Sequence, residues 1–177
     1  TLLQSFLKYC LETDRYPIHF DNPPYWHQYC PTFRPLLPLL IHAEMNAIKE
    51  KVGFEGTLQE FFKFMKEDKQ FYYPDTKEGR AEYMKTATML IDSMKGRLDE
   101  LFLRKPKADM IVKAVEPFRE KSAGKAFYQS PSKDGSRPGI YYANLYNMQD
   151  MPTYQMEALA YHEGIPGHHM QRAIAQE

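Results

Sequence analysis

The chain is organised around the run Tyr161-His162-Glu163-Gly164-Ile165-Pro166-Gly167-His168-His169-Met170-Gln171. This run holds half of the six histidines of the chain, and a carboxylate directly follows the first of them. Imidazole is the commonest protein ligand for zinc, and a nearby carboxylate can take a proton from a metal-bound water. The residue types in this run therefore predict a catalytic metal site.

The spacing of the histidines does not fit an unbroken helix. The common zinc motif H-E-x-x-H places two histidines one turn apart on one helix face, with the glutamate as general base. Between His162 and His168 an unbroken helix would turn by about 600° and rise by about 9 Å, and to His169 it would rise by about 10.5 Å. Pro166 cannot donate to the carbonyl of His162, and glycines on both sides of it tolerate unusual backbone angles. We therefore predict a bulge or short loop that brings His168 beside His162; the alternative is a helix end followed by surface histidines.

The same run resembles a known family signature, H-E-x-x-P-G-H-H-x-Q. This signature is typical of a large, mostly bacterial family of metallopeptidase-like proteins, the domain of unknown function eight-eight-five. Two further blocks resemble the family, residues 44–64 and residues 134–144, the latter matching D-G-S-R-P-G-x-Y-Y-x-N. The resemblance implies a helical, zincin-like metallopeptidase domain that binds Zn²⁺.

The resemblance also implies roles for individual residues. His162 and His168 are the expected metal ligands and Glu163 the expected general base, because Gly167-His168 matches the Gly-His pair of H-E-x-G-H peptidases. A catalytic zinc usually has three protein ligands and a water, and the resemblance implies a third ligand from a glutamate beyond residue 177. His169 is expected to be catalytic as an oxyanion donor, although a role beside a ligand or in packing stays open.

A short strand before this run is the expected substrate-binding element. By analogy with thermolysin-like peptidases, we predict that residues 140–145 form an edge strand that pairs with the substrate backbone. Tyr141 or Tyr142 could donate to the oxyanion, Arg137 could hold a substrate carboxylate, and Asn144 is a further substrate-binding candidate. Packing of the tyrosines and a structural salt bridge of the arginine are the alternatives.

The remaining pattern predicts a mainly α fold in a single domain over residues 1–177. An irregular segment rich in proline and aromatic residues covers 14–38, a small antiparallel sheet covers 108–145, and the active-site helix covers 152–177. Helices are predicted over about 39–52, 57–68 and 76–103, and Thr57 with Glu60 forms a capping box at the start of the second. Strands are predicted over 108–115 and 140–145, whereas 122–128 is ambiguous.

Composition excludes some partners and leaves other properties open. The formal net charge is zero at pH 7, which argues against nucleic acid as a partner, and no apolar run is long enough to span a membrane. Cys10 and Cys30 could form a disulfide or remain free thiols. The chain starts without methionine and ends within a helical pattern, so we expect it to belong to a longer protein. The compartment and the oligomeric state stay open.

The metal-binding pattern together with the family resemblance implies a zinc-dependent hydrolase of peptides, of carboxypeptidase or oligopeptidase type. Glu163 would assist the attack of a metal-bound water on a peptide carbonyl. Residues 1–177 alone are expected to be inactive, because the third ligand would be missing. The alternative is a non-catalytic helical binding or scaffold protein with a structural or vestigial metal site.

Overall fold

The computed structural model describes residues 36–100, 102–134 and 136–177, and divides the chain into two compact units, residues 1–64 and 65–177. The sequence predicted a single domain over the same length. Most of the segment predicted to be irregular, residues 14–35, lies outside the described residues, as do Cys10 and Cys30. No helix among the described residues is both long and apolar enough to cross a membrane.

The first unit contains α3 (Leu36–Lys51) and most of α4 (Leu58–Glu67). The capping box predicted before α4 is confirmed. The backbone N–H of Thr57 donates to Glu60 Oε2 at 2.7 Å, and the N–H of Glu60 donates to Thr57 Oγ1 at 3.2 Å. These bonds satisfy backbone donors at the helix start and fix where α4 begins.

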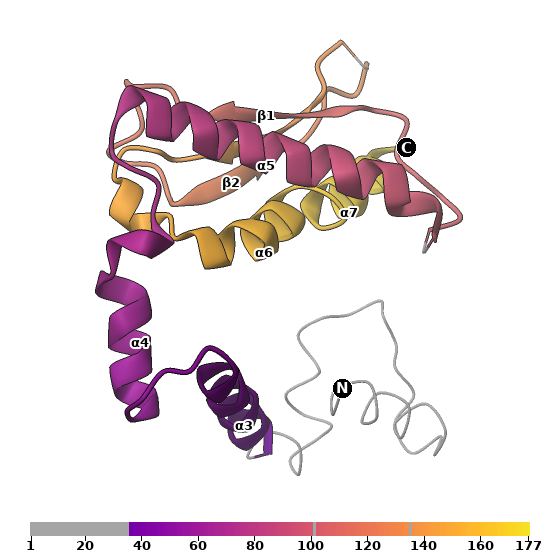
Figure 1. Ribbon diagram of the computed structural model, residues 1–177. Coiled ribbons are helices and arrows are strands. Elements are labelled where there is room, and N and C mark those ends of the chain that lie inside the picture. The colour runs from indigo at the N-terminus through magenta and orange to yellow at the C-terminus, as the bar shows by residue number, and fades with distance from the viewer. Residues whose placement is uncertain (1–35, 101, 135) are drawn as a thin grey trace, which may run out of the picture. The chain divides into compact units, whose positions relative to one another are not determined.

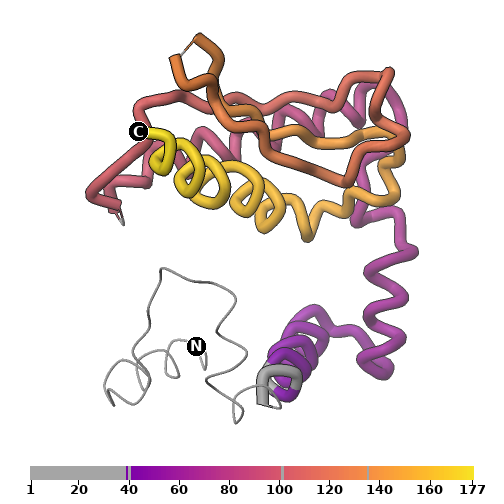
Figure 2. The backbone as a smooth tube through the Cα atoms, turned by 180° about the vertical axis from the view of Figure 1, so that it is seen from behind, coloured from indigo at the N-terminus to yellow at the C-terminus, as the bar shows by residue number. Residues whose placement is uncertain are grey.

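The second unit combines helices with a three-stranded sheet. Its helices are α5 (Lys77–Arg97), α6 (Thr153–Glu163) and α7 (His168–Gln176), and its strands are β1 (Met110–Ala114), β2 (Ala126–Gln129) and β3 (Gly139–Ala143). Short 3₁₀ turns lie at η2 (Lys69–Phe71), η3 (Leu98–Glu100) and η4 (Met148–Asp150). Figure 1 looks onto α5 with the strands behind it, and Figure 2, from the opposite side, shows the strands in front.

The helices cover one face of the sheet because their apolar residues recur at helical spacing. On α5, Tyr83, Ala87 and Ile91 are four residues apart and buried. They share a core with buried residues from all three strands and from α6 and α7, including Met110, Tyr128, Tyr141, Ala143, Met156, Ala160 and Met170. A second, smaller cluster of Val115, Ile140 and Tyr142 lies on the other face, since successive strand residues point to opposite faces.

The predicted antiparallel sheet of two strands is wrong in two respects. The two predicted strands, β1 and β3, pair in parallel, with Met110 opposite Gly139 and Ala114 opposite Ala143. A third strand, β2, pairs antiparallel with β3, so the strand order is β1-β3-β2 and the sheet is mixed. β3 is therefore the central strand, and the prediction that residues 140–145 form an edge strand is also wrong.

Candidate metal centre

A four-residue break separates α6 from α7, and two close backbone contacts shape it. The N–H of Gly167 donates to the carbonyl of Tyr161 at 2.8 Å, and that of Gly164 donates to Ala160 at 2.8 Å. A Cβ on Gly167 would lie 2.0 Å from the carbonyl oxygen of His162, so only glycine permits this approach. The start of α7 is thereby held against the end of α6.

This break brings two imidazoles and one carboxylate together. The rings of His162 and His168 have centroids 4.9 Å apart. Glu163 lies between them, with Oε1 4.0 Å from Nε2 of His162 and Oε2 3.9 Å from Nε2 of His168. One ligand atom from each of the three residues lies within 4.8 Å of the other two. The backbone interruption thus places His168 beside His162, which an unbroken helix could not do.

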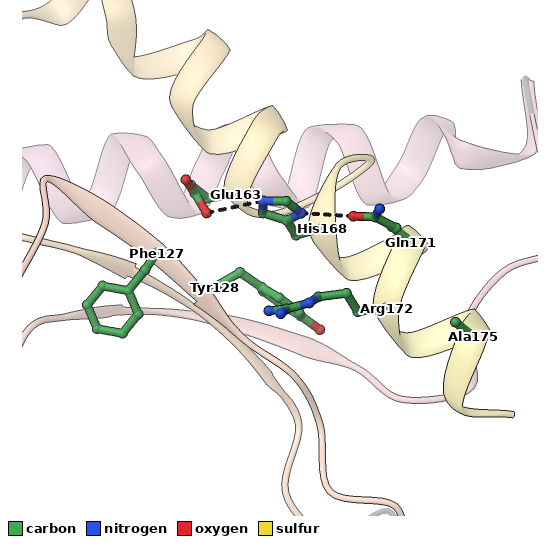
Figure 3. A pocket seen from close by; sticks show the side chains of 7 residues that line it. All are labelled: Phe127, Tyr128, Glu163, His168, Gln171, Arg172 and Ala175. Atoms are coloured by element: carbon green, nitrogen blue, oxygen red, sulfur yellow. Dashed lines mark hydrogen bonds and ion pairs between the residues drawn. The ribbon is translucent and has the colours of Figure 1, made fainter. Parts of the chain in front are cut away.

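The side chain of Gln171 orients His168. Gln171 Oε1 lies 3.0 Å from His168 Nδ1, and the two residues are three apart on α7. Because an amide oxygen can only accept, Nδ1 of His168 is the donor in this hydrogen bond, and in the neutral ring Nε2 then carries the lone pair. Nε2 is the atom that faces Glu163, so the ring presents a free ligand atom to the cluster (Figure 3).

The donor set fits a zinc ion by its chemistry. Two imidazole nitrogens and a carboxylate oxygen are ordinary zinc ligands, and two ligands about 2.1 Å from a tetrahedral ion lie about 3.4 Å apart. The observed spread of up to 4.8 Å is slightly wider and needs only small side-chain rotations to close. Among the described residues no other cluster of metal-ligating side chains is found. A third protein ligand other than Glu163 is therefore absent from this part of the chain.

His169 is buried and has both ring nitrogens occupied. Nε2 lies 3.0 Å from the carbonyl of Ala108, and Nδ1 lies 2.8 Å from the hydroxyl of Tyr128. The carbonyl can only accept, so Nε2 carries the proton and Nδ1 accepts from the tyrosine hydroxyl. Burial lowers the pKa of His169 below its ordinary value, which favours the neutral ring. The predicted role of His169 as an oxyanion donor is not supported by this geometry, because its single N–H is already donated.

A pocket of about 560 Å³ opens beside the cluster. Glu163 and His168 contribute to its wall, and the other lining residues are Phe127, Tyr128, Gln171, Arg172 and Ala175 (Figure 3). The pocket therefore lies between β2 and α7, next to two of the three residues of the cluster. Burial raises the pKa of Tyr128 to about 12, and the charges of Arg172 and Arg137 oppose that rise.

The strand that borders the pocket is β2, which no sequence pattern assigned. The N–H of Asn144 donates to the carbonyl of Lys125 at 3.0 Å, so in the antiparallel ladder the hydrogen-bonded pairs occur at every second residue from there. Tyr128 opposite Tyr141 is then a non-hydrogen-bonded pair, and the backbone N–H and C=O of Tyr128 point away from β3. The free edge of the sheet at the pocket is thus formed by β2.

Two residues predicted for the site lie away from it. Tyr142 points to the opposite face of the sheet, where its hydroxyl donates to Glu116 at 3.3 Å and its ring stacks on Phe127. The side-chain amide of Asn144 donates to the carbonyls of Glu120, Ala123 and Gly124. Neither lies in the lining of the pocket beside the cluster, so the predicted oxyanion role of Tyr142 and the substrate role of Asn144 are corrected to structural roles.

Tyr141 packs in the core between the sheet and the helices and is closed off from solvent. Its relative exposure is 0%, and its hydroxyl makes no hydrogen bond of good geometry with any described residue. Burial first, then the neighbouring Tyr83 and the charge of Glu163, raise the pKa of Tyr141. Tyr141 is fully buried and is not part of the pocket lining, so its predicted contact with a substrate oxyanion is not supported by this geometry.

Arg137 lies on the loop before β3, and its guanidinium donates to the carbonyl of Pro138 at 3.4 Å. No ion pair links it to a carboxylate among the described residues, so the structural salt bridge considered as an alternative is not observed there. Three polar pocket residues were missed as site residues: Tyr128, Gln171 and Arg172. Gln171 stands in the family signature, and Arg172 lies four residues after His168, which on a helix is the same face.

The fold and the cluster define a helix-and-sheet domain with a His-Glu-His constellation at an interrupted helix. The chain belongs to the family described as "Bacterial protein of unknown function (DUF885)", whose model matches residues 40–177. A solved structure, "the crystal structure of the putative lipoprotein from Colwellia psychrerythraea", is similar to the chain at 32% identity with a TM-score of 0.73. The match covers 78% of this chain but only 24% of that one. No curated protein matches the chain.

Proposed function

We propose that this family member contributes the metal-binding part of a zinc-dependent hydrolase that cleaves peptides. The observation that supports the proposal is the convergence of His162, Glu163 and His168, with ligand atoms within 4.8 Å, at the wall of an open pocket. A closed structural metal site would have four protein ligands and no pocket beside it. The chain spans about a quarter of the similar solved structure, so the proposed activity is that of a longer protein to which these residues contribute the metal ligands.

In this proposal each residue of the cluster has a separate task. His162 and His168 would hold the ion through their Nε2 atoms, and Gln171 keeps the latter in the required tautomer. Once bound, the ion would supply Lewis-acid polarisation of a carbonyl and of a water molecule. Glu163 would then take a proton from the attacking water at one carboxylate oxygen and deliver it to the leaving amine.

The edge of β2 is the proposed binding site for the substrate backbone. The outward N–H and C=O of Tyr128 can pair with an extended peptide, as an added strand pairs with an open sheet edge. This replaces β3, which is central in the sheet and has both edges occupied. A peptide lying along β2 would run past Glu163 and His168, because all of these residues line one pocket (Figure 3).

A second candidate function keeps the metal but not the hydrolysis. Glu163 lies between the two rings, at 4.0 Å from one and 3.9 Å from the other, so its carboxylate could itself be the third ligand. In that case the cluster would be a structural metal site of a binding or scaffold protein. The two candidates assign different roles to the same carboxylate, which makes Glu163 the residue to change.

The test is Glu163→Gln in the full-length protein, with zinc content measured by inductively coupled plasma analysis alongside peptide hydrolysis. If Glu163 is the base, the variant keeps its zinc and loses about 10²- to 10⁴-fold in turnover. If Glu163 is a ligand, zinc content falls instead. Glu157→Gln is a matched control, since Glu157 is an exposed carboxylate on α6 outside the pocket. Unchanged turnover in Glu163→Gln would refute the proposed hydrolysis.

A further inference from the structure

Arg172 is the charged pocket residue that the proposed hydrolysis leaves without a role. It lies on α7 four residues after His168, and both side chains line the pocket. Arg172 forms no ion pair or hydrogen bond with any residue in the part of the chain that the structure describes. Several other arginines are held by carboxylates: Arg80 by Asp75 at 2.7 Å, Arg97 by Glu100 at 2.8 Å and Arg119 by Glu116 at 2.6 Å.

A second arginine lies near the same place. The guanidinium of Arg137 donates to the carbonyl of Pro138 at 3.4 Å and has no carboxylate partner among the described residues. The charges of Arg172 and Arg137 both lower the pKa of Tyr128 against the effect of burial, so both guanidinium groups are near this pocket residue, although only Arg172 belongs to the pocket lining. Glu163 is the carboxylate in the pocket lining, and it faces the two imidazoles instead. The positive charge on this side of the pocket is therefore not balanced by the described residues.

We propose that Arg172, with Arg137 nearby, binds a carboxylate that the substrate carries next to the cleaved bond. The substrates would then be peptides with either a free C-terminal carboxylate or an acidic side chain at that position. A guanidinium presents two parallel N–H donors that match a carboxylate, and such charge-assisted bonds are about twice as strong as neutral ones. This inference rests on the proposed peptide hydrolysis and adds the chemical class of its substrate.

The geometry of α7 fixes the distance between His168 and Arg172. His168 and Arg172 are one helical turn apart, with a rise of about 6 Å and a rotation of about 40° between them. One extended residue of a peptide spans about 3.5 Å. A carboxylate one residue beyond a carbonyl at His168 therefore lies within reach of the Arg172 side chain, which extends from α7 toward Tyr128 (Figure 3).

Binding is measured on the zinc-loaded full-length protein carrying Glu163→Gln, so that hydrolysis does not consume the probe. The three probes are tetra-alanine with a free carboxylate, tetra-alanine amide, and the same amide with one internal aspartate. Calorimetry should show that an acidic probe binds about 10- to 100-fold more tightly than the neutral amide. Adding Arg172→Gln should abolish this preference, whereas Arg97→Gln, which removes an exposed arginine outside the pocket, should retain it.

The probes distinguish the source of the carboxylate. A preference for the free acid alone identifies the C-terminal carboxylate, and a preference for the aspartate amide identifies an acidic side chain. Equal binding of all three probes, no binding of any, or a preference that survives Arg172→Gln would overturn the inference. If the preference holds but the protein with Glu163 intact does not hydrolyse the bound peptide, the proposed hydrolysis fails and the carboxylate site remains.

Discussion

Replacing Gly167 with alanine should separate the two imidazoles. The added Cβ would lie 2.0 Å from the carbonyl oxygen of His162 and 2.5 Å from that of Tyr161. Both neighbours are backbone atoms, and real Cβ atoms essentially never approach closer than 3.0 Å, so the chain must move by about 1 Å at least. Metal ligand distances tolerate only about 0.2 Å. The substitution should therefore disturb the cluster without touching any of its side chains.

The expected cost in stability follows from the same contact. Overpacking of a close-packed site costs about 1–3 kcal/mol, and the Gly167 contact is at the severe end because no flexible side chain can yield. With a urea slope of about 1–3 kcal/mol per M, the unfolding midpoint should fall by roughly 1 M. Zinc affinity, measured by calorimetric titration of the full-length protein, should fall by at least tenfold.

Gly96→Ala is the matched control. Gly96 lies on the exposed side of α5, and a Cβ there would meet nothing within 4 Å. Alanine is favoured over glycine in a helix by about 1 kcal/mol, so this variant should be slightly more stable and should bind zinc normally. If Gly167→Ala kept both the unfolding midpoint and the zinc affinity of the parent protein, the close approach of α7 to the end of α6 would not be what holds the imidazoles together.

Two further outcomes are expected. Gln171→Ala should weaken zinc binding about 10- to 100-fold because His168 Nδ1 loses its hydrogen-bond acceptor, whereas Gln171→Glu should retain the zinc affinity of the parent. Equal zinc affinity of the parent and both variants in titration calorimetry would exclude the orienting role of Gln171. The Lys95 ammonium, with help from the Met110 N–H, holds the pKa of Asp109 below its ordinary value of 3.8. The ionised Asp109 therefore stabilises the folded state fully above pH 3.8, and this stabilisation is lost as the pH falls through the lower pKa of the folded state. Because Asp109 is largely exposed, the effect at pH 7 should be only about 0.5 kcal/mol. The difference in urea unfolding between Asp109→Asn and the parent should shrink as the pH is lowered below 3.8; a difference that grew on acidification would contradict this reasoning.

Local features of the chain were predictable from the sequence because local chemistry determines them. Thr57 and Glu60 form the expected capping box, and the apolar spacing on α5 places Tyr83, Ala87 and Ile91 in the core. The break in the last helix followed from the missing N–H of proline and from the glycines, and the structure places it over residues 164–167. These signals depend on residues within one or two turns of each other.

The arrangement of the sheet was not predictable in the same way. β2 has only four residues, and its neighbours contain no period of two strong enough to assign a strand. Whether β3 lies at the edge or in the centre of the sheet depends on which strand β2 pairs with, and that pairing is set by long-range contacts and not by local sequence. The errors for Tyr142 and Asn144 followed from that pairing, since both were assigned to a substrate edge that β2 occupies instead. The helical register of α7 already placed Arg172 above His168, and this signal could have been used.

The imidazole of His169 links α7 to the sheet through hydrogen bonds. It is bonded to Ala108 ahead of β1 and to Tyr128 on β2, and it packs over Gly139 of β3, where any larger residue would collide with it. His168, the adjacent residue, belongs to the cluster. A bound ligand that displaced β2 would strain the hydrogen bond between Tyr128 and His169 and would tilt the adjacent ring of His168. Binding of a ligand in the pocket and binding of a metal ion at the cluster would then be thermodynamically linked, so that each would change the affinity of the protein for the other by the same factor.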